Sequence, residues 1–229
     1  MQSQLATLVA MINSISNSLQ AGITPIVRVP SNCSEWISRV LDGGAQAVIV
    51  PHVNSAAEAR DVVRCAKFQP LGERSATSGL PLFKYRSVGA KYGNLVANEA
   101  TLVIVMIETE RALEVADEIA MVEGVDMILI GTNDLSADMG IAGEFDHPKI
   151  AAAYRTVASA CHKASQASGQ IKSLGVGGLN SRLDLLERFT REDEFGVSRY
   201  IMSATDSPIL MAGMTSKVKQ MSELEAKLQ

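Results

Sequence analysis

The chain has 229 residues, of which 47% are hydrophobic and 20% are charged, and its formal net charge is −4. Its length is close to that of a whole (β/α)₈ barrel, roughly 250 residues, and its composition is that of a soluble globular protein with a sizeable core. The negative charge and the absence of a Lys/Arg cluster argue against nucleic acid or an anionic membrane as a partner.

Strand-like apolar runs alternate with amphipathic stretches along the whole chain. In chain order the pattern predicts helix 2–20, strand 24–30, helix 34–42, strand 46–52, helix 56–66, strand 101–108, helix 111–121, strand 125–131, helix 148–168, strand 173–177, helix 180–189, strand 200–203 and helix 207–227. The stretch 69–98 is less regular and is expected to hold a loop and then a helix, and a loop is expected after residue 131.

Six strands, each followed by a helix, predict a parallel sheet whose faces are covered. Two architectures fit this pattern, an open doubly wound sheet and a closed barrel. No G-x-G-x-x-G follows the first strand and no P-loop motif occurs, which disfavours the nucleotide-binding open sheets. The pattern therefore favours a barrel, and residues 1–229 are expected to form a single domain.

The cysteines indicate a reducing compartment. Cys33, Cys65 and Cys161 are widely spaced, odd in number and without a C-x-x-C pair, which predicts reduced thiols in a cytoplasmic protein. The apolar runs are too short to span a bilayer, and the N-terminus lacks a secretory signal, so no membrane association is expected.

Two carboxylates follow neighbouring predicted strands, at the end where parallel α/β folds place their active sites. Glu108 ends the most hydrophobic strand, and Asp134 follows the next one, after Gly131, which lets a ligand approach the backbone. Because neighbouring strands lie about 4.8 Å apart, the pair is predicted to share a hard cation such as Mg²⁺. The alternatives are a solvent-facing Glu108, and an Asn133 or Asp134 that only caps a short helix.

Other polar residues stand at ends of strands or helices. Arg28 would offer a planar fork to a substrate carboxylate, unless it extends into solvent. Asp42 opposes the dipole at a helix end, although Asp before two glycines is also ordinary turn chemistry. His52 ends its strand and is a candidate acid or base, whereas His147 and His162 are expected to be structural.

Several segments together resemble the HpcH/HpaI aldolases, of the 4-hydroxy-2-oxoheptane-1,7-dioate aldolase type. They are PIVRVP (25–30), VLDGGA (40–45), VPHVN (50–54), IET (107–109), EGVD (123–126) and the most specific one, IGTNDLSADMG (130–140). The likeness runs from about residue 4 to residue 215. It implies a phosphoenolpyruvate/pyruvate-type barrel that cleaves a 4-hydroxy-2-oxo acid reversibly to pyruvate and an aldehyde, with Mg²⁺, Mn²⁺ or Co²⁺.

The resemblance also implies roles for single residues. Glu108 and Asp134 match the two metal carboxylates of the family. Arg28 matches an arginine that binds the pyruvate carboxylate and stabilises the enolate. Asp42 matches an aspartate that tunes the catalytic histidine of the family.

The chain departs from the family pattern around the substrate. Gly131 and Asn133 fall where backbone amides hold the substrate, but Thr132 and Asn133 stand where the family usually has Pro-Ala. Met106 replaces a usual glutamine, which removes a polar contact from the substrate-binding surface near the metal. The general base of the family, a histidine in a D-x-E-H segment after its second strand, would precede residue 1.

We therefore expect a (β/α)₈ barrel that lacks its first two strands and keeps six parallel ones. The resemblance further implies an oligomer whose subunits exchange the last helix, 207–227. Three functions stay open: a metal-dependent aldolase, a weak or silent homologue without the histidine base, and an oxaloacetate-decarboxylase-like lyase. We expect feeble or no aldol activity from these 229 residues, whether the short N-terminus is natural or the natural protein is longer.

Overall fold

The strands of the protein form one parallel sheet. The structure, a computed structural model, describes residues 2–77 and 79–228, and the side chains from residue 6 onward. The strands are β1 (Ile26–Arg28), β2 (Ala47–Val50), β3 (Leu102–Ile107), β4 (Met127–Gly131), β5 (Ser173–Gly177) and β6 (Ser198–Ile201). Their order in the sheet is their order in the chain, β1-β2-β3-β4-β5-β6. This is the order of a barrel, because a doubly wound sheet reverses its strand order at a switch point.

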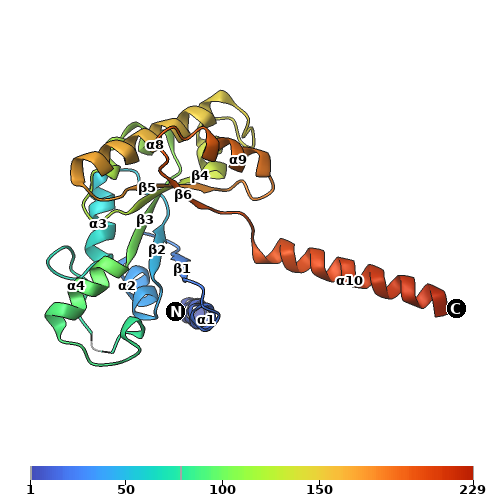
Figure 1. The fold of residues 1–229 in the computed structure, drawn as a ribbon, viewed down its shortest axis with the longest axis horizontal. Coiled ribbons are helices and arrows are strands. Elements are labelled where there is room, and N and C mark those ends of the chain that lie inside the picture. Colours follow the sequence, from blue (N-terminus) through green and yellow to red (C-terminus); the bar gives the residue numbers. More distant parts are fainter. Residues whose placement is uncertain (1, 78, 229) are drawn as a thin grey trace.

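Helices connect the strands, and α2, α3 and α8 pack against the sheet (Figure 1). In chain order the helices are α1 (Gln2–Gln20), α2 (Ser34–Asp42), α3 (Ala56–Ala66), the 3₁₀ helix η1 (Pro81–Phe83), α4 (Ala90–Ala100), α5 (Glu110–Glu114), α6 (Ala116–Ala120), α7 (Thr132–Asp138), α8 (Pro148–Ser168), α9 (Leu183–Arg191) and α10 (Asp206–Leu228). The described residues contain no candidate membrane-spanning helix.

The strand side chains alternate between two apolar clusters. The cluster beneath the helices includes Val48, Val103, Val105 and Ile128. The cluster on the other, concave face consists of Ala47, Ile49, Ile104, Met106 and Leu129, with Ile26, Met127 and Tyr200 packed against it. Such an inner cluster fills the lumen of a closed barrel. Within the described residues β1 and β6 each pair on one side only, so the six strands form an open, curled part of a barrel, as predicted.

Two predicted elements are wrong. The helix expected over 111–121 is divided into α5 and α6 at Val115, whose φ of −108° and ψ of 20° are not helical. The loop expected after Gly131 begins with helix α7. Its sequence is rich in turn formers, but Leu135 is fully buried and the hydroxyl of Ser136 donates to the Asn133 carbonyl at 2.8 Å. Tertiary packing therefore stabilises a short helix that no periodicity reveals.

The terminal helix α10 extends away from the sheet and its covering helices (Figure 1). None of its described residues is buried. Its large apolar side chains are 48% to 79% exposed, namely Ile209, Leu210, Met211, Met214, Val218, Met221, Leu224 and Leu228. A helix with so many apolar side chains in water lacks the packing partner that usually stabilises helices in proteins.

Candidate active site

Glu108 is a buried carboxylate at the end of the most apolar strand. It follows β3 on the concave face and is 2% exposed. Its Oε2 accepts a hydrogen bond from the His52 backbone N–H at 2.7 Å, and the His52 Nδ1 lies 2.9 Å from the same oxygen. Burial raises the pKa of Glu108, the contacts with His52 oppose this shift, and the nearby Asp134 carboxylate adds to it. The site therefore disfavours the charged form of Glu108 unless a cation is bound.

Gly131 leaves the space that Glu108 occupies. The ladder between β3 and β4 pairs Ile107 with Ile130, which puts Glu108 beside Gly131. A Cβ atom on Gly131 would lie 2.6 Å from the Glu108 Cγ and 2.8 Å from its Oε1. Asp134 follows in the first turn of α7, close enough to raise the pKa of Glu108 by its charge and by hydrogen bonding. The structure thus brings Glu108, Gly131 and Asp134 together.

The donor set of this site fits a hard divalent cation. Among the described residues, His52 is the one ion-pair partner that Glu108 has, and the Asp134 carboxylate raises the pKa of Glu108. A divalent cation bound between the two carboxylates would offset their repulsion. Mg²⁺ and similar ions bind to one or two protein carboxylates and complete their shell with water and substrate oxygens. In the described part of the chain no group of three or more His, Cys, Asp or Glu side chains is arranged to hold a metal ion, whereas zinc sites usually need three protein ligands.

Thr132 anchors the start of α7 to the end of β5. Its hydroxyl donates to the Gly177 carbonyl at 2.6 Å and accepts from the Tyr154 hydroxyl at 2.7 Å. Tyr154 is buried in α8, its ring stacks on Phe189 at 4.3 Å, and burial raises its pKa strongly. This anchor fixes the helix that carries Asp134. In the sequence Thr132 stands out only as a departure from the family pattern, and no pattern there indicates Tyr154 as its partner.

Asn133 and Met106 border the same site. Asn133 is exposed, and its side-chain amide donates to the Gly178 carbonyl at 3.2 Å. Met106 is 6% exposed and points to the concave face two residues before Glu108. The apolar side chain of Met106 therefore forms part of the surface beneath the two carboxylates.

Arg28 lies on the same concave face at the end of β1. It is exposed, and side-chain alternation puts it on the side of Ile26, which packs against the inner cluster. β2 lies between β1 and β3, so one strand separates Arg28 at the end of β1 from Glu108 at the end of β3. Arg28 lines a hollow of about 610 Å³ between α1, β1 and Tyr200. A volume of that size is typical of small-molecule sites.

The structure does not bring Asp42 to Glu108 within one chain. Helix α2 runs back from the end of β1, so Asp42 at its C-terminus precedes the start of β2. Its Oδ1 accepts from the Arg74 Nη2 at 2.6 Å and from the Nε at 3.1 Å. Arg74 is 6% exposed and lies over the Phe68 ring at 4.5 Å. Asp42 thus neutralises a buried arginine near the N-terminal ends of the strands, a partner in an irregular loop that no sequence pattern indicates.

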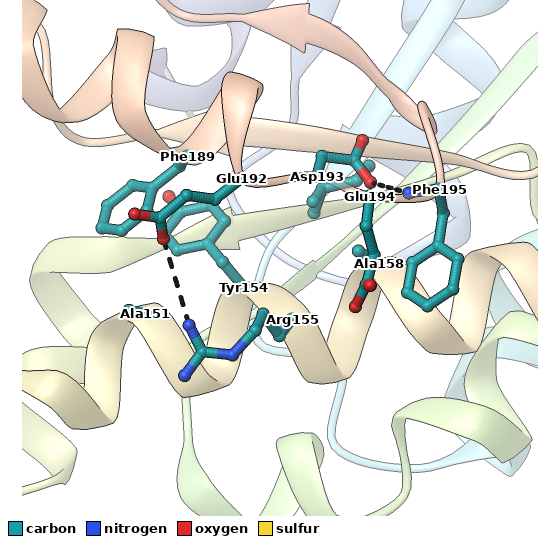
Figure 2. A pocket seen from close by; sticks show the side chains of 10 residues that line it. Ala151, Tyr154, Arg155, Ala158, Phe189, Glu192, Asp193, Glu194 and Phe195 are labelled. Carbon is teal, nitrogen blue, oxygen red and sulfur yellow. Dashed lines mark hydrogen bonds and ion pairs between the residues drawn. The ribbon is translucent and has the colours of Figure 1, made fainter.

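A second hollow lies on the outer face between α8 and the segment after α9 (Figure 2). Arg155 and Glu192 face each other across it at 4.0 Å, and the Asp193 carboxylate accepts from the Phe195 N–H at 3.2 Å. Its volume of about 10 Å³ holds no more than one water molecule. This hollow is too small for a substrate.

Comparisons with known proteins agree on one family. Residues 6–181 match the family described as HpcH/HpaI aldolase/citrate lyase. The chain is 40% identical to 4-hydroxy-4-methyl-2-oxoglutarate aldolase tasA of Hapsidospora irregularis over 197 residues, 85% of this chain and 70% of that protein. It is 38% identical to 4-hydroxy-2-oxo-heptane-1,7-dioate aldolase of Salmonella typhimurium LT2 over 145 residues, 63% of this chain and 55% of that protein.

A solved structure has the same fold. The crystal structure of an HpcH/HpaI aldolase from Desulfitobacterium hafniense DCB-2 matches with a TM-score of 0.75 and 27% identity, over 93% of this chain and 78% of that chain. The chain thus spans most of the solved structure but little more than half of the Salmonella relative.

Proposed function

The chain belongs to the HpcH/HpaI aldolase/citrate lyase family, and from this we propose that it is a divalent-metal-dependent lyase that cleaves 4-hydroxy-2-oxo acids to pyruvate and an aldehyde. The names of its relatives support this substrate class, because they are aldolases of 4-hydroxy-2-oxo acids. The observation that carries the proposal is the pairing of Glu108 with Asp134 at adjacent strand ends. This pair follows the C-terminal ends of β3 and β4, the end of the strands at which barrel enzymes bind substrates.

Each residue of the site has a proposed task. Glu108 and Asp134 would hold the cation, which when bound would act as a Lewis acid toward the 2-oxo acid. Arg28 would bind the substrate carboxylate through paired hydrogen bonds from its planar guanidinium. Gly131 and Asn133 would let the substrate approach the backbone at the start of α7.

The surroundings of Met106 support a contact with the substrate, and those of Asp42 do not. Met106 would give the substrate an apolar contact below the carboxylates, since it is part of the inner cluster. We do not place Asp42 in contact with substrate, because its carboxylate is paired with Arg74 at the other end of the strands.

Calorimetric titration with Mn²⁺ tests the metal ligands. The wild type should bind one ion, and Asp134→Ala should weaken its binding at least about 10-fold, since losing a charged ligand costs more than about 1.4 kcal/mol. Glu118→Ala is the matched control, because it removes an exposed carboxylate from α6. Equal affinities for the wild type and Asp134→Ala would rule out the proposed pair.

A coupled assay for pyruvate tests the reaction. Release of pyruvate from a 4-hydroxy-2-oxo acid, which we expect to be slow, should require added Mg²⁺ or Mn²⁺ and should be lost in Glu108→Ala. Oxaloacetate serves as a second substrate, because decarboxylation of a β-keto acid demands less of a base. Metal-dependent release from oxaloacetate alone would assign the chain to the decarboxylase-like lyases instead.

We also propose that residues 1–229 form one domain whose last helix packs on another copy of the chain. Support comes from α10, whose apolar side chains have no packing partner among the described residues. Burying them against a second subunit would contribute about 25 cal/mol per Å² of apolar surface.

A further inference from the structure

His52 adopts a backbone conformation that is uncommon for a residue other than glycine. It follows β2 with a φ of 55°, in the left-handed region that non-glycine residues rarely occupy. Such strain is most often found at functional sites, where the surroundings hold the residue in place. In this conformation the His52 backbone N–H points to the Glu108 carboxylate.

Two groups of His52 hold one oxygen of Glu108. The backbone N–H donates to Oε2 at 2.7 Å, and the ring Nδ1 lies 2.9 Å from the same atom. The other oxygen, Oε1, faces Gly131, where a Cβ atom would come within 2.8 Å of it. The two oxygens of this carboxylate therefore have different surroundings: Oε2 is held by His52, and Oε1 faces the side of β4.

The turn that carries His52 is itself fixed to the residue after Glu108. The Asn54 side-chain amide donates to the His52 carbonyl at 2.9 Å, and the Thr109 hydroxyl donates to the Asn54 Oδ1 at 2.6 Å. The Asn54 backbone N–H also donates to Glu58 at 2.7 Å. These bonds connect the ends of β2 and β3, so the imidazole meets the carboxylate in a defined orientation while 65% of its side chain stays exposed.

We propose that His52 is the positioning residue of the metal carboxylate: it fixes Oε2 of Glu108 so that Oε1 is presented to the cation and to Asp134. This inference rests on the proposed role of Glu108 as a metal ligand. It requires the neutral imidazole to carry its proton on Nδ1, because an ionised carboxylate can only accept. Groups that orient a metal ligand in this way typically contribute 10- to 100-fold to metal affinity.

Three variants of His52 distinguish the role of Nδ1 from that of Nε2. In His52→Asn the side-chain NH₂ group takes the place of Nδ1, and Asn tolerates the left-handed conformation. In His52→Gln the NH₂ group lies about where Nε2 was, and His52→Gly removes the side chain without straining the backbone. We expect Mn²⁺ affinity to fall at least about 10-fold in the Gly and Gln variants and to stay within about threefold of wild type in the Asn variant. Any other pattern overturns the inference.

A second measurement needs no metal. The chain has three histidines, so ¹⁵N-labelled imidazoles can be assigned by comparing the wild type with His52→Asn. In the pH range where Glu108 is ionised and the imidazole is neutral, which a pH series identifies, we expect His52 to be the Nδ1–H tautomer in the wild type and in Asp134→Ala, and to lose this preference in Glu108→Ala. An Nε2–H tautomer in the wild type overturns the inference. If the wild type binds no Mn²⁺, the proposed function fails, and the tautomer alone then decides whether His52 holds Glu108.

Discussion

Replacing Gly131 by alanine should disturb the carboxylate pair by contact alone. Gly131 has a φ of −86° and a ψ of 82°, so no left-handed conformation makes glycine necessary there. An added methyl group would lie 2.6 Å from the Glu108 Cγ and 2.8 Å from its Oε1. Ordinary carbon–carbon contacts are about 3.5–4.0 Å, so the Glu108 side chain would have to retreat by about 1 Å.

The surroundings of Glu108 resist such a retreat. The side chain is 2% exposed, and two groups of His52 hold its Oε2. Overpacking of this kind costs about 1–3 kcal/mol, while the lower chain entropy of unfolded alanine returns about 0.4–1 kcal/mol. The net destabilisation should be about 1.3 kcal/mol, midway between limits of about 0 and 2.6 kcal/mol, which lowers the melting temperature by about 3–5 °C in a chain of this size.

Denaturant unfolding without metal, followed by Mn²⁺ titration, measures both effects. Gly131→Ala should lower the denaturation midpoint at an unchanged m-value and weaken Mn²⁺ binding about 10-fold or more, because Oε1 is displaced. Gly93→Ala in α4 is the control: its added Cβ would lie 3.6 Å from the Phe83 ring, an ordinary contact, so it should not lower the midpoint or change Mn²⁺ affinity. In a Glu108→Ala background the cost of Gly131→Ala should disappear. A Gly131→Ala protein as stable as the wild type, with the same Mn²⁺ affinity, would refute the reasoning.

Three more outcomes are expected. Arg28→Lys should fold normally, because Arg28 is exposed. It should bind oxalate about 10-fold or more weakly, since one charged hydrogen bond contributes about 1.5–3 kcal/mol. An unchanged dissociation constant for oxalate would show that Arg28 is a surface residue without a role in binding. Light scattering should give more than the monomer mass at micromolar concentration, because α10 is apolar and uncovered, and a monomer would contradict this. The Cys161 thiol should resist alkylation at pH 8, because burial raises its pKa to about 12, while the half-buried Cys33 reacts. The stability that this protonated thiol provides should be full below pH 9 and decline as the pH rises toward 12, and equal alkylation of both thiols would contradict the burial.

The helices that the sequence predicts best are those whose ends are marked by residues typical of helix starts or stops. The helix over 56–66 has the predicted bounds: its N-cap, Ser55, accepts from the Glu58 N–H. The helix over 148–168 begins at a proline and ends before Gly169, whose φ is 69°. The first strand is shorter than the predicted 24–30, because ladder pairing covers only Ile26–Arg28 and proline has no N–H to donate.

The sequence predicts only those parts of the site that follow from the direction and order of the strands. Glu108 and Asp134 follow neighbouring parallel strands, so the sequence alone brings them to one edge of the sheet. The contact of His52 with Glu108 depends on a left-handed backbone conformation that non-glycine residues rarely adopt, and no sequence pattern indicates it. The Thr132–Tyr154 bond joins residues from different βα units, and only the folded sheet shows that they meet.

Glu108 and Asp134 are held in place by different sets of contacts. β3 determines where Glu108 lies along the sheet, and His52 holds its Oε2. Because Gly131 has no side chain, there is room for Oε1. Asp134 depends on a separate set of bonds, because α7 is anchored through Thr132 to β5. The geometry of the pair is therefore set by the consecutive strand ends β2 to β5, all within the part of the sheet that is fully paired. For that reason the arrangement of the carboxylates does not depend on what lies along the outer edges of β1 and β6, which no described strand pairs with. The surroundings of Arg28, which is on β1 itself, do depend on it.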